Sequence, residues 1–303
     1  MPNQSQDSQN VLITGASGLI GSAIGNALRE AGYTVYALER SNKNAPFNID
    51  ISENRIELDA GIPLTAVINL AGANIAGGRW TEKRKQLLRD SRLQTTRLLC
   101  EALAQSQQKP ELLLSASAIG YYGSQQTEPA DENAEPGDDF LARLSVDWEK
   151  ATEAAADADI RVVILRFGLV MSADGGMLDK LIMPLKAAVA GRIGDGSHLQ
   201  SWISIRDVVS VMLRCMENRE FSGPLNVVAP EVLSNKEFVR TLSQVLRRPL
   251  LPPVPVPVAR LIFGEMADAA LLASSNIRSS RMQELGMTPA FPNLKEALEA
   301  EFS

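Results

Sequence analysis

The sequence feature that constrains this chain most is a short apolar run that leads directly into a glycine-rich loop. Residues 11–14 read Val-Leu-Ile-Thr, which is typical of a buried parallel strand. Gly15, Gly18 and Gly21 follow at G-x-x-G-x-x-G spacing, and an amphipathic helical pattern then extends as far as Gly32. A strand, a glycine loop and a helix in this order predict a unit that binds a dinucleotide.

Each glycine of the loop has its own physical task in such a unit. Gly15 permits a tight turn, Gly18 lets a pyrophosphate approach the backbone, and Gly21 lets the helix pack closely on the strand. The free N–H groups at the helix N-terminus and the positive end of the helix dipole favour phosphate. The predicted cofactor contacts in the loop are Gly15, Ser17, Gly18, Leu19, Ile20 and Gly21.

The end of the second predicted strand, at 34–38, bears on which nicotinamide nucleotide the chain binds. A carboxylate at this point binds the ribose hydroxyls of NAD, whereas an arginine pairs with the 2′-phosphate of NADP. Glu39 and Arg40 stand here side by side. Both are predicted cofactor contacts, and the expected cofactor is NADP(H) or NAD(H), with the choice between the two left open.

The order of the segments that follow predicts an α/β fold. Apolar runs suited to parallel strands alternate with helical patterns up to residue 168. This alternation predicts a Rossmann-type, doubly wound parallel sheet with right-handed crossovers. The predicted strands are 65–70, 112–115 and 160–165, and the predicted helices are 81–105 and 138–156. Thr81 is a suitable cap for the first of these helices.

The alternation stops after Gly168, and this break marks a second, smaller region. Strands are still expected at 201–205 and 225–228, but the sequence from Ser234 onward is mostly helical. The stretch 252–257 is predicted to be an extended connector, because proline lacks a backbone donor and disfavours helix before it. We predict a dinucleotide-binding domain at 10–172, to which 199–230 returns, and a C-terminal substrate lobe at 173–198 and 231–303.

Scarce histidine and cysteine exclude several kinds of site. The 303 residues include one histidine, His198, and two cysteines, Cys100 and Cys215. A zinc site needs three or four such ligands close together, so no metal site is predicted. Two cysteines make no disulfide scaffold, and both are expected to be packing residues. His198 lies in a polar turn and is predicted to be an exposed loop residue.

Charge and hydropathy narrow the partners and the location. The net charge is −6 and the pI about 5.1, which argues against nucleic acid as a partner because phosphate binding needs a basic surface. The chain has no run of 18 apolar residues that predicts a membrane span, and residues 1–10 lack the pattern of a signal peptide. The predicted location is the cytoplasm.

Several segments carry motifs that belong together. They are the Val-Leu-Ile-Thr-Gly-Ala-Ser-Gly start at 11–18, Asn-Leu-Ala-Gly at 69–72, the serine–tyrosine segment 115–123, the segment 194–208, and Gly-Pro-Leu-Asn-Val at 223–227. Together they resemble the extended short-chain dehydrogenases/reductases, the group of sugar-nucleotide epimerases and dehydratases. The longer stretch 69–80, Ser91-Arg92, and the stretches 120–123, 136–141 and 263–268 resemble the atypical "epimerase family protein" branch, sometimes labelled cell-division-inhibitor-like.

The resemblance covers nearly the whole chain and implies where a cofactor and a substrate bind. It implies bound NADP(H) or NAD(H), a C-terminal lobe that closes over a substrate cleft, and a homodimer through the long helices. The further cofactor contacts are Asn69, Leu70, Ala71, Gly72, Ser115 and Arg166. The predicted substrate contacts are Arg79, Trp80, Tyr122, Gln200 and Trp202. Arg79 and Trp80 are included because a cation and a large aromatic follow a flexible Gly-Gly turn.

The proton-transfer pair of the wider group is absent from this chain. The group uses a serine with Tyr-x-x-x-Lys, in which the lysine lowers the pKa of the tyrosine. The chain has four tyrosines, and none has a lysine four residues later. If Glu149 matches the glutamate that follows the lysine in the group, Leu141 occupies the position of the tyrosine and Ser145 that of the lysine. The alternative alignment places Phe140 and Leu144 at these two positions.

Two functions remain open at this point. Ser117 keeps the serine position, and Tyr121 is the predicted substitute acid, although a lone tyrosine near its ordinary pKa of ~10 is a poor base at neutral pH. The first hypothesis is an NADP(H)- or NAD(H)-binding oxidoreductase or epimerase-like protein for an unknown small carbonyl or sugar-like substrate, with Ser117 and Tyr121 as catalytic residues. The alternative is a nucleotide-binding regulatory protein with little or no catalytic activity.

Overall fold

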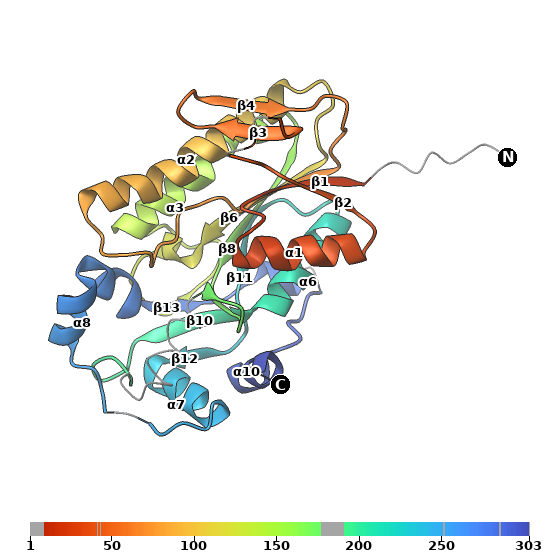
Figure 1. The fold of residues 1–303 in the computed structure, drawn as a ribbon. Helices are drawn as coiled ribbons and strands as arrows, with labels where there is room; N and C mark the ends of the chain where they lie inside the picture. Colours follow the sequence, from red (N-terminus) through yellow and green to blue (C-terminus); the bar gives the residue numbers. More distant parts are fainter. Residues whose placement is uncertain are drawn as a thin grey trace.

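The computed structural model describes residues 9–302 except 41, 43, 177–190, 251 and 285. Its centre is a six-stranded parallel sheet in the order β11-β8-β6-β5-β1-β2 (Figure 1). In that order the strands are Gly223–Val227, Arg161–Phe167, Leu112–Ala118, Ala66–Asn69, Asn10–Thr14 and Thr34–Ala37. One face carries α1 (Leu19–Glu30) and α6 (Ile205–Glu217), and the other carries α2 (Glu82–Gln105), α3 (Phe140–Lys150) and α4 (Glu153–Ala156). The predicted doubly wound α/β fold is confirmed.

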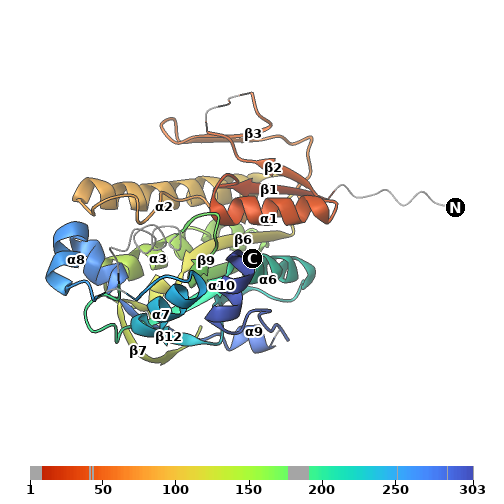
Figure 2. The ribbon, with the colours of Figure 1, turned by 60° about the horizontal axis from the view of Figure 1, so that its bottom comes forward.

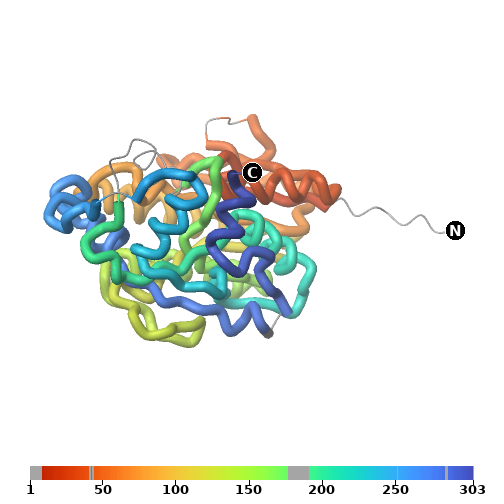
Figure 3. The backbone as a smooth tube through the Cα atoms, turned by 90° about the horizontal axis from the view of Figure 1, so that it is seen from below, coloured from red at the N-terminus to blue at the C-terminus, as the bar shows by residue number. Residues whose placement is uncertain are grey.

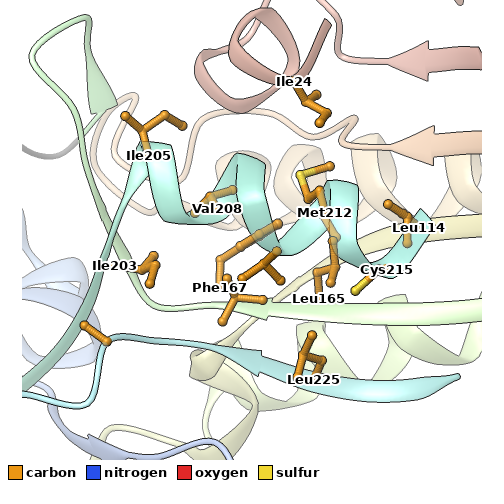
Figure 4. Packing of buried hydrophobic residues seen from close by; sticks show 14 of the residues in the cluster. Ile24, Leu114, Leu165, Phe167, Ile203, Ile205, Val208, Met212, Cys215 and Leu225 are labelled. Carbon is orange, nitrogen blue, oxygen red and sulfur yellow. The ribbon is translucent and has the colours of Figure 1, made fainter. Parts of the chain in front are cut away.

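The sheet is apolar on both faces because helices cover it from both sides. On the α6 side, Val208 and Met212 point from the helix toward Leu114, Leu165 and Leu225 of the strands, and all five side chains are buried (Figure 4). Cys215 belongs to this cluster, and Cys100 lies in the cluster on the α2 side. Burial raises the pKa of each thiol to about 12, so both cysteines are packing residues, as predicted.

Side-chain caps fix where several of the helices begin. The Thr81 hydroxyl accepts a hydrogen bond from the Arg84 N–H at 3.2 Å, which confirms the predicted cap of α2. Asp139 caps α3 and Ser204 caps α6 in the same manner.

A smaller region completes the molecule below the central sheet in Figure 1. It holds a second sheet in the order β12-β10-β9, and β13 pairs in parallel with β7. These strands are Val232–Ser234, Leu199–Ser204, Leu169–Met171, Ser274–Ile277 and Gln125–Ala130. The helices are α7 (Asn235–Val245), α8 (Val256–Phe263), α9 (Arg281–Glu284) and α10 (Leu294–Phe302), with short helices η1 (Ile119–Tyr122) and η2 (Ala267–Leu271). Figures 2 and 3 show α7 and α10 side by side, which agrees with the mostly helical C-terminal region that was expected.

An antiparallel hairpin between β2 and β5 was not predicted. It consists of β3 (Phe47–Asp50) and β4 (Arg55–Leu58), with Asn54 in the turn at φ +49°. Each strand has only four residues and alternates apolar with polar side chains, so the sequence signal is short. Phe47 and Ile49 are buried in the cluster that includes Leu99 of α2, and this tertiary contact stabilises the hairpin.

Two helix boundaries differ from the sequence prediction. The helix expected at 138–156 is divided into α3 and α4, because the Thr152 hydroxyl donates a hydrogen bond to the Glu149 carbonyl and interrupts the backbone ladder. The proline-rich connector is shorter than predicted, since α8 already begins at Val256 and includes Pro257. Proline is tolerated there because the first turn of a helix needs no backbone donor.

The return of the chain to the central sheet involves β11 and α6, which packs on α1, whereas β10 lies in the smaller sheet. The domain boundaries themselves stay predictions, as do the homodimer and the cytoplasmic location. Among the residues that the structure describes, no helix combines the length and the apolar character needed to cross a membrane.

Candidate active site

The glycine loop joins β1 to α1 in a conformation that only glycine allows. Gly15 has φ +67°, and a Cβ there would lie 2.8 Å from the Leu70 carbonyl oxygen. A Cβ at Gly21 would lie 2.2 Å from the Gly15 carbonyl oxygen, because α1 packs directly on the loop. The Gly18 N–H donates to the Gly15 carbonyl at 2.9 Å and closes the turn. The three glycines thus have the close contacts that the motif requires.

The first turn of α1 is suited to an anion. No side chain caps this helix end, and no acidic residue lies in its first turn. An open cavity of about 590 Å³ adjoins it, lined by Ser17, Gly18 and Leu19, by the segment 172–176, and by Arg206, whose charge is paired with that of Glu301. The loop therefore fits the pyrophosphate of a dinucleotide. The segment 172–176 was not predicted to be part of a site, although its Gly175-Gly176 pair was an available signal.

Glu39 and Arg40 follow β2 but have different surroundings. The Glu39 N–H donates to the Phe47 carbonyl at 3.0 Å, and its carbonyl accepts from the Ile49 N–H at 2.8 Å, so its backbone continues the hairpin edge. Glu39 is half-buried, whereas Arg40 is exposed.

Two predicted cofactor contacts, Asn69 and Ser115, are buried in a polar network instead of facing open space. Asn69 Oδ1 accepts from the Thr14 hydroxyl at 2.8 Å, and its Nδ2 donates to Thr96 Oγ1 at 2.8 Å and Ser115 Oγ at 3.2 Å. Asn69 is 0% and Ser115 1% exposed. Their side chains therefore hold β1, β5 and β6 in register at the carboxyl ends of these strands.

Leu70, Ala71 and Gly72 form the segment that leaves β5. The N–H groups of Leu70 and Ala71 both donate to Thr14 Oγ1 at 3.0 Å. A Cβ at Gly72 would lie 2.9 Å from the guanidinium carbon of Arg92, which is buried and donates to the Ala73 carbonyl. Burial lowers the pKa of Arg92 to about 10. Arg92 thus fastens this segment to α2.

A buried ion pair lies at the carboxyl end of β6 and β8. Arg166 donates from Nε and Nη2 to the two carboxylate oxygens of Glu149, both at 2.8 Å, and Ser117 donates to Glu149 Oε1 at 2.6 Å. The side chains of Arg166 and Glu149 are 4% and 14% exposed. Burial alone would lower the pKa of Arg166, but its hydrogen bonds and the charge of Glu149 raise that pKa above its ordinary value. Arg166 therefore carries its charge permanently.

The same guanidinium contacts both tyrosines of η1. Its Nη1 donates to the Tyr122 hydroxyl at 2.9 Å, and that hydroxyl donates to Asn226 Oδ1 at 2.8 Å. Burial raises the pKa of Tyr122 to about 12, so its phenol keeps its proton at neutral pH. The guanidinium carbon lies 3.5 Å from the ring centroid of Tyr121, a close cation–π contact.

A cavity of about 230 Å³ opens between the carboxyl edge of the sheet and the smaller region. Its lining comes from η1, the start of α3, the β8–β9 junction, β10 and the segment from η2 to β13. The lining residues are Ile119, Gly120, Gly123, Asp139, Leu141, Phe167, Gly168, Leu169, Gln200, Ser201, Ala269, Ala270, Ala273 and Ser275. Leu141 lines the cavity, whereas Ser145 is buried. Neither of the two alignments considered above therefore places a proton donor of α3 in the cavity.

The predicted substrate contacts divide into one that lines this cavity and four that do not. Gln200 is part of the wall. Trp80, Tyr122 and Trp202 are 7%, 4% and 0% exposed and pack within the protein, so they do not line this cavity, and their assignment as substrate contacts stays a prediction. Arg79 is exposed and lies beside Gly264, outside the cavity. Burying a large aromatic side chain is strongly favourable in free energy, and a motif does not show whether the side chain is buried.

His198 is half-buried, so the prediction of an exposed loop residue is wrong. It lies directly before β10, next to the Leu271 backbone with which it hydrogen-bonds, and its Nε2 atom is buried. Burial lowers the pKa of the imidazole, and the nearby charge of Asp195 offsets only part of this effect.

The titration of His198 is therefore predicted to have a midpoint below the ordinary value of about 6.5. The chain has one histidine, so a single imidazole Hε1 signal reports it in a proton NMR titration. Because the unfolded chain binds this proton more tightly, stability contributed at this site is lost as the pH falls below 6.5. His198→Gln should make the melting temperature less sensitive to pH in that window. A midpoint at or above 6.5 would contradict the prediction.

Sequence reasoning missed two site carboxylates. In the sequence, Glu149 was used only to align the chain with the Tyr-x-x-x-Lys motif. In the structure it accepts hydrogen bonds from Ser117 and Arg166. Asp139 lines the cavity. Its position directly before α3 indicates only an N-terminal cap of that helix and gives no hint of a place in a cavity. Residues 269–275, just after the matched stretch 263–268, gave no signal, because alanine, leucine and serine in a helical context indicate no particular chemistry.

Comparison with known proteins places these features in a wider context. Residues 11–228 match the NAD dependent epimerase/dehydratase family, and residues 254–301 match a domain of unknown function, DUF1731. Epimerase family protein Mb2239 of Mycobacterium bovis is 37% identical to this chain over 95% of the chain and 96% of its own length.

Solved structures show the same fold over nearly the whole chain. The crystal structure of human epimerase family protein SDR39U1 with NADPH has a TM-score of 0.87 and 31% identity, covering 96% of this chain and 98% of that one. The nucleoside-diphosphate sugar epimerase from Corynebacterium glutamicum has a TM-score of 0.75 and 30% identity, covering 97% of this chain and 58% of that one. The similarity includes both the glycine loop and the C-terminal region.

Proposed function

This chain belongs to the NAD-dependent epimerase/dehydratase family, and we propose from this premise that it is an NADPH-dependent oxidoreductase for a small carbonyl compound. The observation that carries the proposal is the uncapped start of α1 behind three glycines, two of which, Gly15 and Gly21, have Cβ positions already filled by neighbouring backbone. That cradle fits a pyrophosphate, and the 230 Å³ cavity lies at the same carboxyl edge of the sheet. When bound, NADPH supplies a hydride to a carbonyl carbon.

Tyr121 is the residue we assign to proton donation toward the carbonyl oxygen. It directly follows Ile119 and Gly120 of the cavity wall, and Arg166 lies 3.5 Å over its ring. The guanidinium packs against the Tyr121 ring and holds it next to the cavity wall. Ser117 has a positioning role in this assignment, because its hydroxyl donates to Glu149 Oε1 at 2.6 Å and so helps to hold the carboxylate that binds Arg166.

We assign NADPH instead of NADH on the basis of Arg40 and the human relative whose structure contains NADPH. Arg40 is exposed at the end of β2, where the 2′-phosphate of NADP lies in this type of fold. Arg40→Ala should weaken NADPH binding about tenfold, the loss of one charge-assisted contact, and leave NADH binding unchanged. Fluorescence titration with both nucleotides measures this.

The control for Arg40→Ala is Arg214→Ala, which removes an equally exposed arginine from the far end of α6. It should not change either dissociation constant. Equal weakening of NADPH and NADH by Arg40→Ala, or no effect on either, would refute the assignment of NADPH specificity to Arg40.

A regulatory protein that binds the nucleotide without turning it over is the second candidate. It is favoured by Leu141 and the buried Ser145, which put no proton donor on the cavity side of α3. Absorbance at 340 nm separates the two functions in purified protein mixed with NADPH and a panel of aldehydes and ketones. Oxidation of NADPH that is lost in Tyr121→Phe supports the enzyme. Tight NADPH binding with no oxidation of the nucleotide across the panel supports the regulatory protein.

A further inference from the structure

The wall of the 230 Å³ cavity is mostly hydrocarbon. Apart from Asp139 and three neutral polar residues, the described residues that line it are glycine, alanine, leucine, isoleucine and phenylalanine. Leu141 is one of them, and one of the two alignments places it where the wider group has its tyrosine. A Cβ at Gly120 would lie 3.3 Å from the Leu141 Cβ, so these two parts of the wall are in contact. The wall is therefore apolar at the position where the wider group has a hydroxyl.

The charge of the described lining disfavours an anionic ligand. Asp139 is the one charged residue among the described residues that line the cavity. Its two carboxylate oxygens accept from the Ser124 N–H at 2.7 Å and from the Ala142 N–H at 2.9 Å, so they hold the backbone at the start of α3. A phosphate or a carboxylate brings negative charge and further acceptors, and this part of the wall offers no cation to pair with them.

The neutral polar side chains of the lining offer little to a hydroxyl-rich ligand. Ser201 Oγ donates to the Ser275 carbonyl at 2.9 Å and accepts from the Ile277 N–H at 2.9 Å. The Ser275 hydroxyl accepts from the Ser201 N–H at 3.4 Å. Gln200 Oε1 is buried, so a ligand in the cavity does not reach it. Hydroxyl groups that leave water for such a wall lose hydrogen bonds, which favours an apolar ligand.

The C-terminal region, which matches the domain of unknown function, supplies one side of the cavity. Before this side of the wall, Glu265 forms an ion pair of 2.6 Å with Lys85 of α2. After it, the Ser274 N–H donates to the Ser124 carbonyl at 2.9 Å. The segment between is fastened at both ends and presents three methyl groups to the cavity, those of Ala269, Ala270 and Ala273. These small side chains leave the space that a ligand can fill.

We propose that this cavity selects a small apolar ketone or aldehyde without charged or nucleotide groups, and that the alanines of the C-terminal region limit its length. Hydrophobic contact supplies the affinity, since each buried methylene group tightens binding about fourfold. The cavity of about 230 Å³ is smaller than the roughly 300–1,000 Å³ of pockets for drug-sized ligands, so the ligand is small. The proposal deepens the proposed function, on which it rests, by naming the substrate class.

Ligand-observed NMR titration of the full chain tests the proposal, first with saturating NADP⁺, which keeps other nucleotides out of the glycine loop, and then without it. Diethyl ketone and dihydroxyacetone are the matched probes, because they have the same shape and differ in terminal methyl or hydroxyl groups. Dihydroxyacetone phosphate and UDP-glucose test for an anionic ligand. Methyl ethyl, methyl propyl and methyl butyl ketone form a series that grows by one methylene group at a time.

Diethyl ketone should bind at least about tenfold more tightly than dihydroxyacetone, because the two hydroxyl groups lose hydrogen bonds to water. It should also bind more tightly than dihydroxyacetone phosphate and UDP-glucose. Along the series of methyl ketones, affinity should rise about fourfold with each methylene group until the cavity is full.

Two substitutions test the two parts of the wall. Leu141→Asn puts a polar group of similar size into the apolar wall, and it should reduce the preference for diethyl ketone over dihydroxyacetone about tenfold. A general loosening of the fold would weaken both probes alike and leave this ratio unchanged. Ala273→Leu fills part of the cavity, and it should weaken methyl butyl ketone about tenfold and methyl ethyl ketone less.

Ala156→Leu is the matched control for Ala273→Leu, because Ala156 is an exposed alanine on α4, outside the cavity. It should leave every dissociation constant unchanged. If Ala273→Leu does not fold, Ala270→Leu makes the same change at another lining residue.

Dihydroxyacetone, its phosphate or UDP-glucose binding as tightly as diethyl ketone would overturn the proposal. Absence of binding by every ketone, an unchanged preference in Leu141→Asn, or an unchanged affinity for methyl butyl ketone in the leucine variant of the alanine wall would overturn it as well. The proposed function fails by a different measurement, the absence of NADPH binding in the fluorescence titration, so the two failures are distinguishable.

Discussion

Replacing Gly21 with alanine should abolish measurable NADPH binding and destabilise the protein by about 1–3 kcal/mol, the usual cost of forcing an extra group into a packed site. The added Cβ would lie 2.2 Å from the Gly15 carbonyl oxygen and 2.9 Å from the Ala16 Cα. Both are backbone atoms, so the loop must move as a whole. A displaced loop no longer presents the N-terminus of α1 to the pyrophosphate.

Gly25→Ala is the matched control for Gly21→Ala, because Gly25 lies one turn further along the same helix. The nearest atom to its added Cβ is a terminal nitrogen of Arg29 at 3.5 Å, an ordinary contact with a flexible side chain. This substitution should be neutral or stabilise the helix by up to about 1 kcal/mol. Urea unfolding and nucleotide titration of both variants measure the difference. Equal behaviour of the two variants would show that the close approach at Gly21 is unimportant.

Arg166→Met should destabilise the protein by about 3–5 kcal/mol, the range measured when one partner of a buried ion pair is removed. The substitution leaves the Glu149 carboxylate with a hydrogen bond from the Ser117 hydroxyl but without its cation, and it removes a donor from the Tyr122 hydroxyl. It also removes the cation over Tyr121, so any NADPH oxidation should fall at least about tenfold. Chemical unfolding and the 340 nm assay give the two readouts.

Arg260→Met provides the comparison for Arg166→Met. Arg260 makes an equally bidentate contact with Asp268, at 2.9 to 3.1 Å, but both side chains are more than half exposed. Water screens such a pair, so its loss should change the unfolding midpoint little. If the two variants lose similar stability, burial of the Glu149–Arg166 pair does not have the importance assigned to it.

The sequence was sufficient for features that depend on residues close together along the chain. The glycine loop, the strands of the central sheet and the cap at Thr81 each follow from neighbouring residues whose spacing sets the local backbone. The hairpin β3–β4 lies at the limit of this reasoning. Its strands are short, and the burial of Phe47 against α2 decides that they form.

The candidate site could be predicted only in part, because its residues come from distant segments. Gln200 and the glycine loop were found from motifs, and both lie where a ligand has access. Trp80 and Trp202 were chosen for their chemistry, but a motif does not tell which face of an element is covered. Trp202 alternates along β10 with Ser201, and packing against the sheet decided that its ring is fully buried.

The sequence by itself determined that this chain has a dinucleotide cradle and that it lacks Tyr-x-x-x-Lys, since both depend on short spacings and on four tyrosines that can be checked one by one. Only the tertiary structure decided which polar side chains come together at the candidate site that lacks the Tyr–Lys pair. Ser117 and Glu149 are 32 residues apart, and Tyr122 lies 44 residues from Arg166, yet hydrogen bonds of 2.6 and 2.9 Å join them. Parallel strands bring their carboxyl ends to one edge of the sheet, so packing of the whole domain sets these distances.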